Sequence, residues 1–191
     1  MTSRIVPPVL PTTYIVERYA SIRTRIANRD VDLVFFDPKI QGPINKTRLA
    51  VENKTIMTAH GKARKNRYGD LIAYANHIHN HFFKAVAGAI VTINVCPNYR
   101  NPDPFATDIE RDYPNMEKIV TDTVKIFTDI PLREKEDEPN DQPEAIAVIL
   151  VDYDGVNEAR LVIDPPAPQL GQPNHYASFV ERLCRLYEER F

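Results

Sequence analysis

The chain has 191 residues, of which 43% are hydrophobic and 26% charged, the composition of a globular protein with a full hydrophobic core. No segment approaches about 18 consecutive apolar residues, and the first residues lack the basic start and apolar run of a signal peptide. These features exclude a membrane-spanning protein, and we expect a cytoplasmic protein with no membrane partner. The two cysteines, Cys96 and Cys184, lack metal-binding spacing, so we expect them to be buried free thiols.

Positive charge is concentrated in one stretch of the chain. Residues 46–67 carry seven basic side chains against one acidic side chain, Glu52, for a net charge of +6, whereas the whole chain carries −2. Such a local excess is typical of a surface that binds nucleic acid, although a solvated loop has the same pattern.

The first half of the chain predicts helix, strand, strand, helix and strand. Helical spacing of Ile15, Tyr19 and Ile22 indicates a first helix within residues 12–28. Residues 31–36 and 48–56 read as two strands joined by a hairpin-like connection. A helix beginning at Asp70 and a buried strand at residues 85–95 follow. Residues 6–10 also allow a further strand.

The second half completes an α/β fold. A helix is expected from Met116 to Phe127, and the acidic residues 134–144 should form an exposed, mobile connection. Residues 145–153 are the clearest buried strand, and Asn174 can cap a last helix. This order predicts an α/β protein with a mixed central β-sheet flanked by helices, forming a single domain over residues 1–191.

Two carboxylates and a lysine are predicted to meet on the hairpin. Glu52 and Lys54 share one face of their strand because alternate residues point the same way. An antiparallel hairpin brings Asp32, at the start of the preceding strand, close to Glu52. Paired carboxylates suit Mg²⁺, with Mn²⁺ as a substitute, and such a site can hydrolyse phosphodiesters with Lys54 orienting the water or offsetting charge. Asp37, in the turn, is a rival to Asp32.

These residues resemble the PD-(D/E)xK nuclease superfamily. The resemblance rests on Asp32 before "LVFF", on "LAVENK" with Glu52 and Lys54, and on the helix and strand that follow. It covers about residues 14–95, which would be the motif-bearing core, with residues 115–191 completing the same domain. It implies a restriction-endonuclease-like αβββαβ core with a C-terminal extension, and a magnesium-dependent endodeoxyribonuclease that acts on DNA, as restriction and defence enzymes do.

The resemblance also assigns roles to single residues. Asp32, Glu52 and Lys54 would be catalytic. The metal would be held by Asp32, Glu52, the backbone carbonyl of Asn53 and, from the first helix, Glu17. Nucleic acid would be bound by His60, Lys62, Arg64, Lys65, Arg67 and Tyr68. The sequence departs from the superfamily at Asn53, where an apolar residue facing the core is usual, and at Val31, where proline is usual.

Other interpretations remain open from sequence alone. One is a non-catalytic nucleic-acid-binding or scaffolding subunit with the same fold. Another is a zinc hydrolase using His77 and His81, which are four residues apart, although exposed histidines at a helix end fit as well. Because cleavage of both strands commonly uses a two-fold dimer, we expect a homodimer, with residues 115–129 and 174–191 as candidate interface helices.

Overall fold

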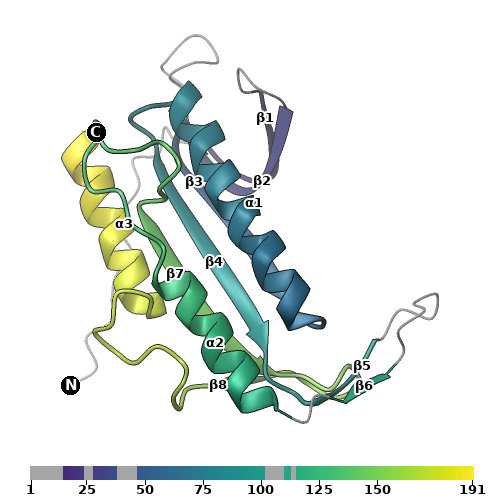
Figure 1. Ribbon diagram of the computed structural model, residues 1–191. Coiled ribbons are helices and arrows are strands. Elements are labelled where there is room, and N and C mark those ends of the chain that lie inside the picture. The colour runs from purple at the N-terminus through teal and green to yellow at the C-terminus, as the bar shows by residue number, and fades with distance from the viewer. Residues whose placement is uncertain (1–14, 24–27, 38–46, 102–109, 113–114) are drawn as a thin grey trace.

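The computed structural model describes residues 15–23, 28–37, 47–101, 110–112 and 115–191. These residues form a six-stranded sheet in the order β1-β2-β3-β4-β7-β8 (Figure 1). The strands are β1 (Ile15–Arg23), β2 (Asn28–Phe36), β3 (Thr47–Ile56), β4 (Val86–Asn94), β7 (Ala145–Asp152) and β8 (Arg160–Val162). Pairing is antiparallel from β1 to β3, parallel from β3 to β7 and antiparallel between β7 and β8. The predicted α/β class with a mixed central sheet is therefore confirmed.

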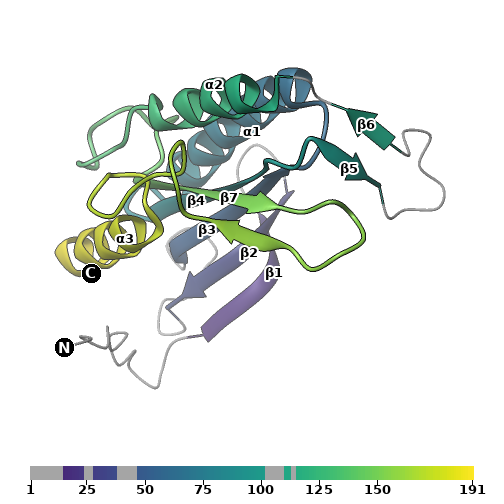
Figure 2. The same cartoon turned by 90° about the horizontal axis from the view of Figure 1, so that it is seen from below.

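Helices cover both faces of the sheet (Figure 2). α1 (His60–His81) and α2 (Met116–Thr128) lie on one face, and α3 (Tyr176–Arg190) lies on the other. β7 contributes to both layers, since Ile146 packs in the cluster under α2 and Ala147 packs against Phe179 of α3. This burial on two faces explains why the central strands are almost uniformly apolar. Within the described residues, no helix has both the length and the apolar character that crossing a membrane requires.

The first predicted helix is wrong, because residues 15–23 form the edge strand β1. Ala20 and Ile22 are buried, whereas Tyr19 before them and Ser21 between them are exposed, which is the two-residue period of a strand. Pairing along β2 supplies the backbone hydrogen bonds that a helix would otherwise have made. Glu17 therefore lies on a strand, and the described order up to β4 is β1, β2, β3, α1, β4. The strand considered at residues 6–10 lies outside the described residues.

α1 begins ten residues before the predicted start, at His60 rather than at Asp70. Its buried stripe of Leu71, Tyr74 and Ile78 continues toward the N-terminus through Ala63, which packs on the main core, and His60. Because basic side chains surround Ala63, at Lys62, Arg64, Lys65 and Arg67, the sequence of the first turns shows no obvious apolar face. The basic stretch is consequently helical, which fixes the spacing of its charges.

The C-terminal half follows the prediction closely, apart from short elements. α2, β7 and α3 form where expected, but the side chain of His175, not Asn174, caps α3 by accepting from the Ala177 amide at 3.2 Å. Asn174 instead donates to the Ile146 carbonyl. Sequence reasoning did not find β8 or the two-stranded ribbon of β5 (Asn98–Arg100) and β6 (Glu110–Asp112), which projects from the sheet (Figure 1).

A buried ionic cluster joins α1, α3 and the acidic connection. Glu144 accepts hydrogen bonds from His79 at 2.9 Å, from the Ala87 amide at 2.7 Å and from Arg190 at 2.7 Å, and Arg133 lies 3.4 Å away. The expectation of exposed histidines is wrong for His79 and His81, which are buried. The connection before Glu144, which was predicted to be exposed and mobile, is held by hydrogen bonds. The Glu138 carboxylate accepts from two backbone amides, and Arg133 donates to the Glu138 carbonyl.

Candidate active site

The hairpin of β2 and β3 brings Asp32 beside the motif strand. Leu33 pairs with Val51, and the ladder between the two strands ends there. One residue further, the Asp32 carboxylate accepts a hydrogen bond from the backbone amide of Asn53 at 2.6 Å. The predicted neighbourhood of Asp32 and the Glu52 strand is therefore present. The rival, Asp37, is instead paired with Arg48 at 3.2 Å.

Glu52 is a buried carboxylate with one oxygen engaged and one unengaged. Its side chain faces α1, and the residue is only 3% exposed. Oε1 forms an ion pair with Lys54 and lies 3.6 Å from the Arg29 guanidinium. Oε2 is buried and has no hydrogen-bond partner among the described residues. An unsatisfied buried carboxylate oxygen is costly, so this atom is suited to a ligand that brings positive charge.

α1 adds a buried tyrosine to the carboxylate pair. The Tyr74 hydroxyl has no hydrogen-bond partner in the described part of the chain, and the Arg29 guanidinium lies 5.4 Å from the ring centre. The pKa of Tyr74 is raised well above its ordinary value, first by burial, then by the charges of Glu52 and Glu144, with a smaller effect of Asp32. Sequence reasoning missed Tyr74 and Arg29, because the tyrosine reads as part of an apolar helical stripe.

Two strained backbone positions adjoin the site. Tyr19 has φ 54° and Ala59 has φ 50°, and among the described residues no other non-glycine residue has a positive φ. The register of β1 with β2 places Tyr19 level with Asp32, where the ladder is interrupted between the Arg18 and Ala20 pairs. Ala59 lies between the motif strand and α1. Strain of this kind clusters at functional sites, where the surrounding structure holds it.

The other predicted ligands lie around this pair. The Asn53 side chain is exposed, so its amide group needs no buried hydrogen-bond partner. In the nuclease superfamily the residue at this position usually faces the core, and here it does not. Glu17 is exposed on β1 opposite Val34, two positions from the level of Asp32. Within the described ranges, no group of three or more histidine, cysteine, aspartate and glutamate side chains is placed to hold a metal ion.

The basic stretch occupies the first turns of α1. Lys62, Lys65 and Tyr68 are exposed, and Arg64 and Arg67 are half-buried. Arg67 donates to the Thr55 carbonyl at 3.3 Å, which links the helix to the end of the motif strand. A hollow of about 330 Å³ lies at this junction, with Lys62 and Arg67 in its lining. Cationic side chains thus border the end of β3, just beyond Lys54.

His60 lies elsewhere than the predicted nucleic-acid surface. It is 1% exposed, and its Nε2 lies 2.7 Å from the Asn94 carbonyl oxygen, to which it donates. Burial lowers the pKa of His60, while the bond to Asn94 acts in the opposite direction. Its ring joins α1 to β4 and is not presented to a phosphate. His77 and His81, the pair considered for zinc, are half-buried and buried, and the His81 ring packs edge-on against Phe82.

The chain was compared with protein-family models, curated proteins and solved structures. None of them matches it. The function of this chain is therefore inferred from the geometry of Asp32, Glu52 and Lys54 and from the charges around them.

Proposed function

We propose that the protein is a magnesium-dependent endodeoxyribonuclease of the restriction-endonuclease-like type, acting in the cytoplasm as a hydrolase of DNA phosphodiester bonds. The proposal rests on the buried Oε2 atom of Glu52, which has no hydrogen-bond partner among the described residues. The Asp32 carboxylate lies next to the same strand, where it accepts from the Asn53 amide. The element order β1, β2, β3, α1, β4 supports it, because Asp32 and Glu52 lie on paired strands of one hairpin.

The residues fit a divalent cation at this position. Glu52 Oε2, an Asp32 oxygen and the backbone carbonyl of Asn53 would supply hard oxygen ligands, the kind that Mg²⁺ and Mn²⁺ prefer. When bound, such an ion lowers the pKa of a coordinated water and polarises a phosphoryl oxygen. Glu17 is a looser candidate, since no described contact ties it to the pair.

Lys54 would supply the catalytic cation. Its ammonium group lies against Glu52 and its side chain is 23% exposed, so it is held at the pair yet accessible from solvent. A lysine there would orient the attacking water and offset the charge that develops on the phosphate. Lys62, Lys65, Arg64 and Arg67 would hold the flanking phosphates of the DNA, which are contacts that position a duplex without reading its sequence.

A second candidate function has one observation in its favour. Both Lys54 and Arg29 approach Oε1 of Glu52, so the carboxylate already has cationic partners without a metal. In a non-catalytic nucleic-acid-binding or scaffolding subunit, this cluster would serve only to fix β2, β3 and α1 together. Such a subunit would still bind DNA through the exposed lysines of α1.

Cleavage of long mixed DNA with Mg²⁺ or Mn²⁺ distinguishes the two functions. The proposal predicts metal-dependent cutting that falls by about 10²-fold or more in Lys54→Ala, since a positioned charge at the reacting centre contributes on that order. Lys125→Ala is the matched control, because Lys125 lies on α2 in an exposed ion pair with Asp129. Salt-sensitive DNA binding without cutting by the wild-type protein would instead favour the scaffold.

A further inference from the structure

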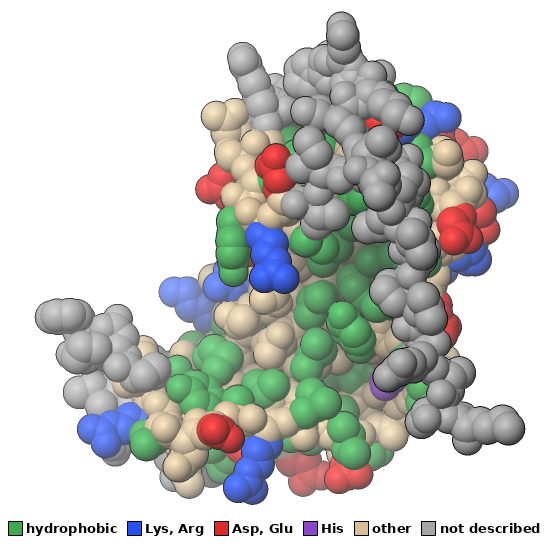
Figure 3. Space-filling view, turned by 180° about the vertical axis from the view of Figure 1, so that it is seen from behind, with side chains coloured by type: hydrophobic (Ala, Val, Ile, Leu, Met, Phe, Trp, Pro, Cys, Tyr) green, Lys and Arg blue, Asp and Glu red, His purple; other side chains and the backbone are tan. Residues whose placement is uncertain are grey.

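The strand β8 forms an apolar edge of the sheet. It is the last strand in the order, and no described strand lies beyond it. Leu161 of β8 and Ile163, which directly follows the strand, are 66% and 70% exposed. Hydrophobic side chains gather across the middle of the face that lies behind α1 and α2 (Figure 3). An exposed apolar group of this kind at a sheet edge is a site for association.

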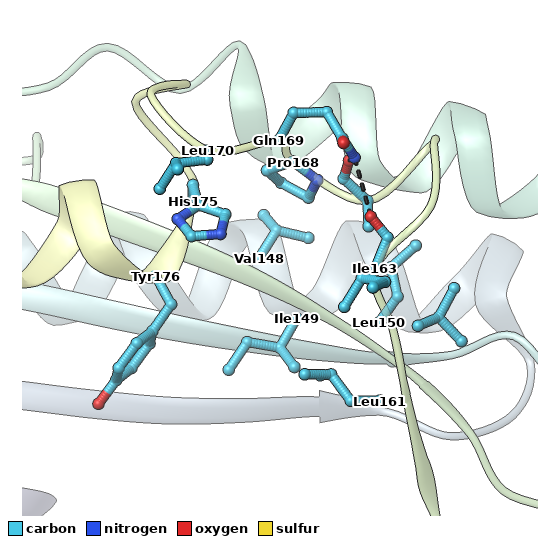
Figure 4. A pocket seen from close by; sticks show the side chains of 12 residues that line it. Val148, Ile149, Leu150, Leu161, Ile163, Pro168, Gln169, Leu170, His175 and Tyr176 are labelled. Atoms are coloured by element: carbon cyan, nitrogen blue, oxygen red, sulfur yellow. Dashed lines mark hydrogen bonds between the residues drawn. The ribbon is translucent and has the colours of Figure 1, made fainter. Parts of the chain in front are cut away.

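A hollow of about 470 Å³ adjoins this edge (Figure 4). Its lining is mainly apolar, with Ile149 and Leu161 from the sheet and Ile163 and Leu170 from the loop that follows β8. Leu170 is 82% exposed, and Tyr176 at the start of α3 is 52% exposed. None of the residues of the proposed active site lines this hollow, so its role is separate from the hydrolysis of a polyanion.

Two opposite charges flank the exposed apolar residues. Arg160 precedes Leu161, and Asp164 follows Ile163; both are exposed. Neither side chain forms an ion pair or hydrogen bond with another described residue, although Asp152 lies opposite Arg160 in the ladder. The stretch from 160 to 164 therefore reads Arg, Leu, Val, Ile, Asp. Its three middle residues are apolar, and its two ends, at equal distances from Val162, carry opposite charges.

That pattern is complementary to itself. If two copies of the stretch run antiparallel with Val162 on a two-fold axis, Arg160 of each copy lies opposite Asp164 of the other. Leu161 likewise lies opposite Ile163, and directly opposite residues have side chains on the same face. A two-fold contact uses the same patch on both subunits, so both charge pairs and both apolar pairs form twice.

We propose that the 160–164 edge is the contact between two copies of this chain. Antiparallel pairing of β8 with its copy would extend the sheet across the dimer and bury Leu161 and Ile163. The opposite edge strand suits such pairing less, because Glu17, Arg18 and Tyr19 are exposed along β1 and its backbone is kinked at Tyr19. The outer face of α2, where Lys118 and Lys125 pair with Asp122 and Asp129, is charged and lacks comparable apolar exposure.

Reversal of the charges tests this contact without removing its apolar residues. In Arg160→Asp, acidic residues would face one another at both ends, and in Asp164→Arg basic residues would do so. Each variant alone should have its dimer dissociation constant raised about tenfold or more, because like charges placed opposite each other are unfavourable. An equimolar mixture of the two variants restores both opposite-charge pairs and should dimerise as the wild type does.

The measurement is sedimentation velocity of the full chain from about 1 to about 100 μM, a range that covers micromolar dissociation constants. Wild-type dimers, weakened in each variant and recovered in the mixture, are the expected result. A wild-type dimer that neither variant weakens would overturn the proposal in favour of another surface. A wild type that stays monomeric throughout would overturn it as well and leave the edge to a different occupant. Neither result depends on nuclease activity.

Discussion

At the scale of single residues, the buried position of His60 indicates a structural role. Its Nε2 donates to the Asn94 carbonyl in a buried position at the first turn of α1. We predict that His60→Ala lowers the free energy of unfolding by about 2 kcal/mol, since a buried carbonyl loses its donor and a ring is removed from the core. Urea denaturation of the two proteins measures this difference.

The same variant separates the two roles that His60 could have. DNA affinity measured where both proteins are folded should change less than about twofold, because the ring has no exposed surface to offer a phosphate. A large loss of affinity together with unchanged stability would contradict the structural role and return His60 to the nucleic-acid surface.

Sequence reasoning placed Asp32, Glu52 and Lys54 on neighbouring strands because strand alternation and hairpin pairing are local rules. It could not place His60, since a histidine among basic residues reads as exposed until the helix that turns it inward is known. Tyr74 and Arg29 were missed for a related reason. Arg29 of β2 approaches Glu52 across the hairpin, and Tyr74 approaches Arg29 because α1 packs over β2; no spacing in the sequence specifies either contact.

At the scale of elements, the first turns of α1 form the positively charged surface. Lys62 and Lys65 are both exposed there and lie three residues apart, so they project on the same side of the helix. We predict that Lys62→Ala and Lys65→Ala each weaken DNA binding and each reduce the slope of log affinity against log salt by about 1, as expected when one phosphate contact is lost. Fluorescence anisotropy with a labelled duplex at several salt concentrations gives the slope.

A control on another helix makes that measurement specific. Lys118 is an exposed lysine on α2 whose surface pair with Asp122 contributes little to stability. Lys118→Ala should leave the salt slope unchanged. Equal reductions in all three variants would mean that the effect follows overall charge and not a binding surface on α1.

Elements differed in how well the sequence specified them. The predictions of β7 and α2 were correct, because a long apolar run in β7 and strong helical periodicity in α2 leave few alternatives. The prediction of a helix at β1 was wrong. Ile15, Tyr19 and Ile22 have helical spacing, but pairing with β2 over most of its length favours the strand. β8 has only three residues, which is too short for a periodic signal.

At the scale of the whole molecule, the cluster around Glu144 joins segments that are far apart in the chain. Its four partners come from α1, β4, the connection before β7 and α3. Both ring nitrogens of His79 lie within hydrogen-bond distance of oxygen atoms, those of the Glu144 carboxylate and the Asn140 carbonyl. Glu144, which directly precedes β7, thereby links that strand to β4 and to helices α1 and α3. The link lies at the end of the sheet opposite the β5–β6 ribbon.

Removal of this carboxylate should destabilise the fold in a pH-dependent way. Burial alone would raise the pKa of Glu144, but the hydrogen bond from His79 and the charge of Arg190 outweigh it and hold the pKa below its ordinary value. Glu144→Gln should therefore cost about 3–5 kcal/mol near pH 7, as expected when one member of a buried ion pair is lost. Urea unfolding at several pH values measures the cost.

The direction of the pH dependence follows from the lowered pKa. A carboxylate whose pKa is lower in the folded protein contributes its full stability above its unfolded pKa of about 4.3, and that contribution is lost as the pH falls through the folded value. The difference between wild type and Glu144→Gln should thus shrink below about pH 4. Glu158→Gln, at an exposed position, is the control. A difference that stays constant from neutral to acidic pH would contradict this account of the cluster.

Cleavage of long duplex DNA by the wild type and by Glu52→Gln, with Mg²⁺ and with excess chelator, shows whether the protein is a metal-dependent nuclease. Glutamine keeps the shape of the side chain but removes the charge beside the buried, unpartnered Oε2. We expect cutting by the wild type with Mg²⁺ only, and a loss of about 10²-fold or more in a folded Glu52→Gln protein. Cutting by Glu52→Gln at the wild-type rate, or cutting that persists in chelator, would contradict it.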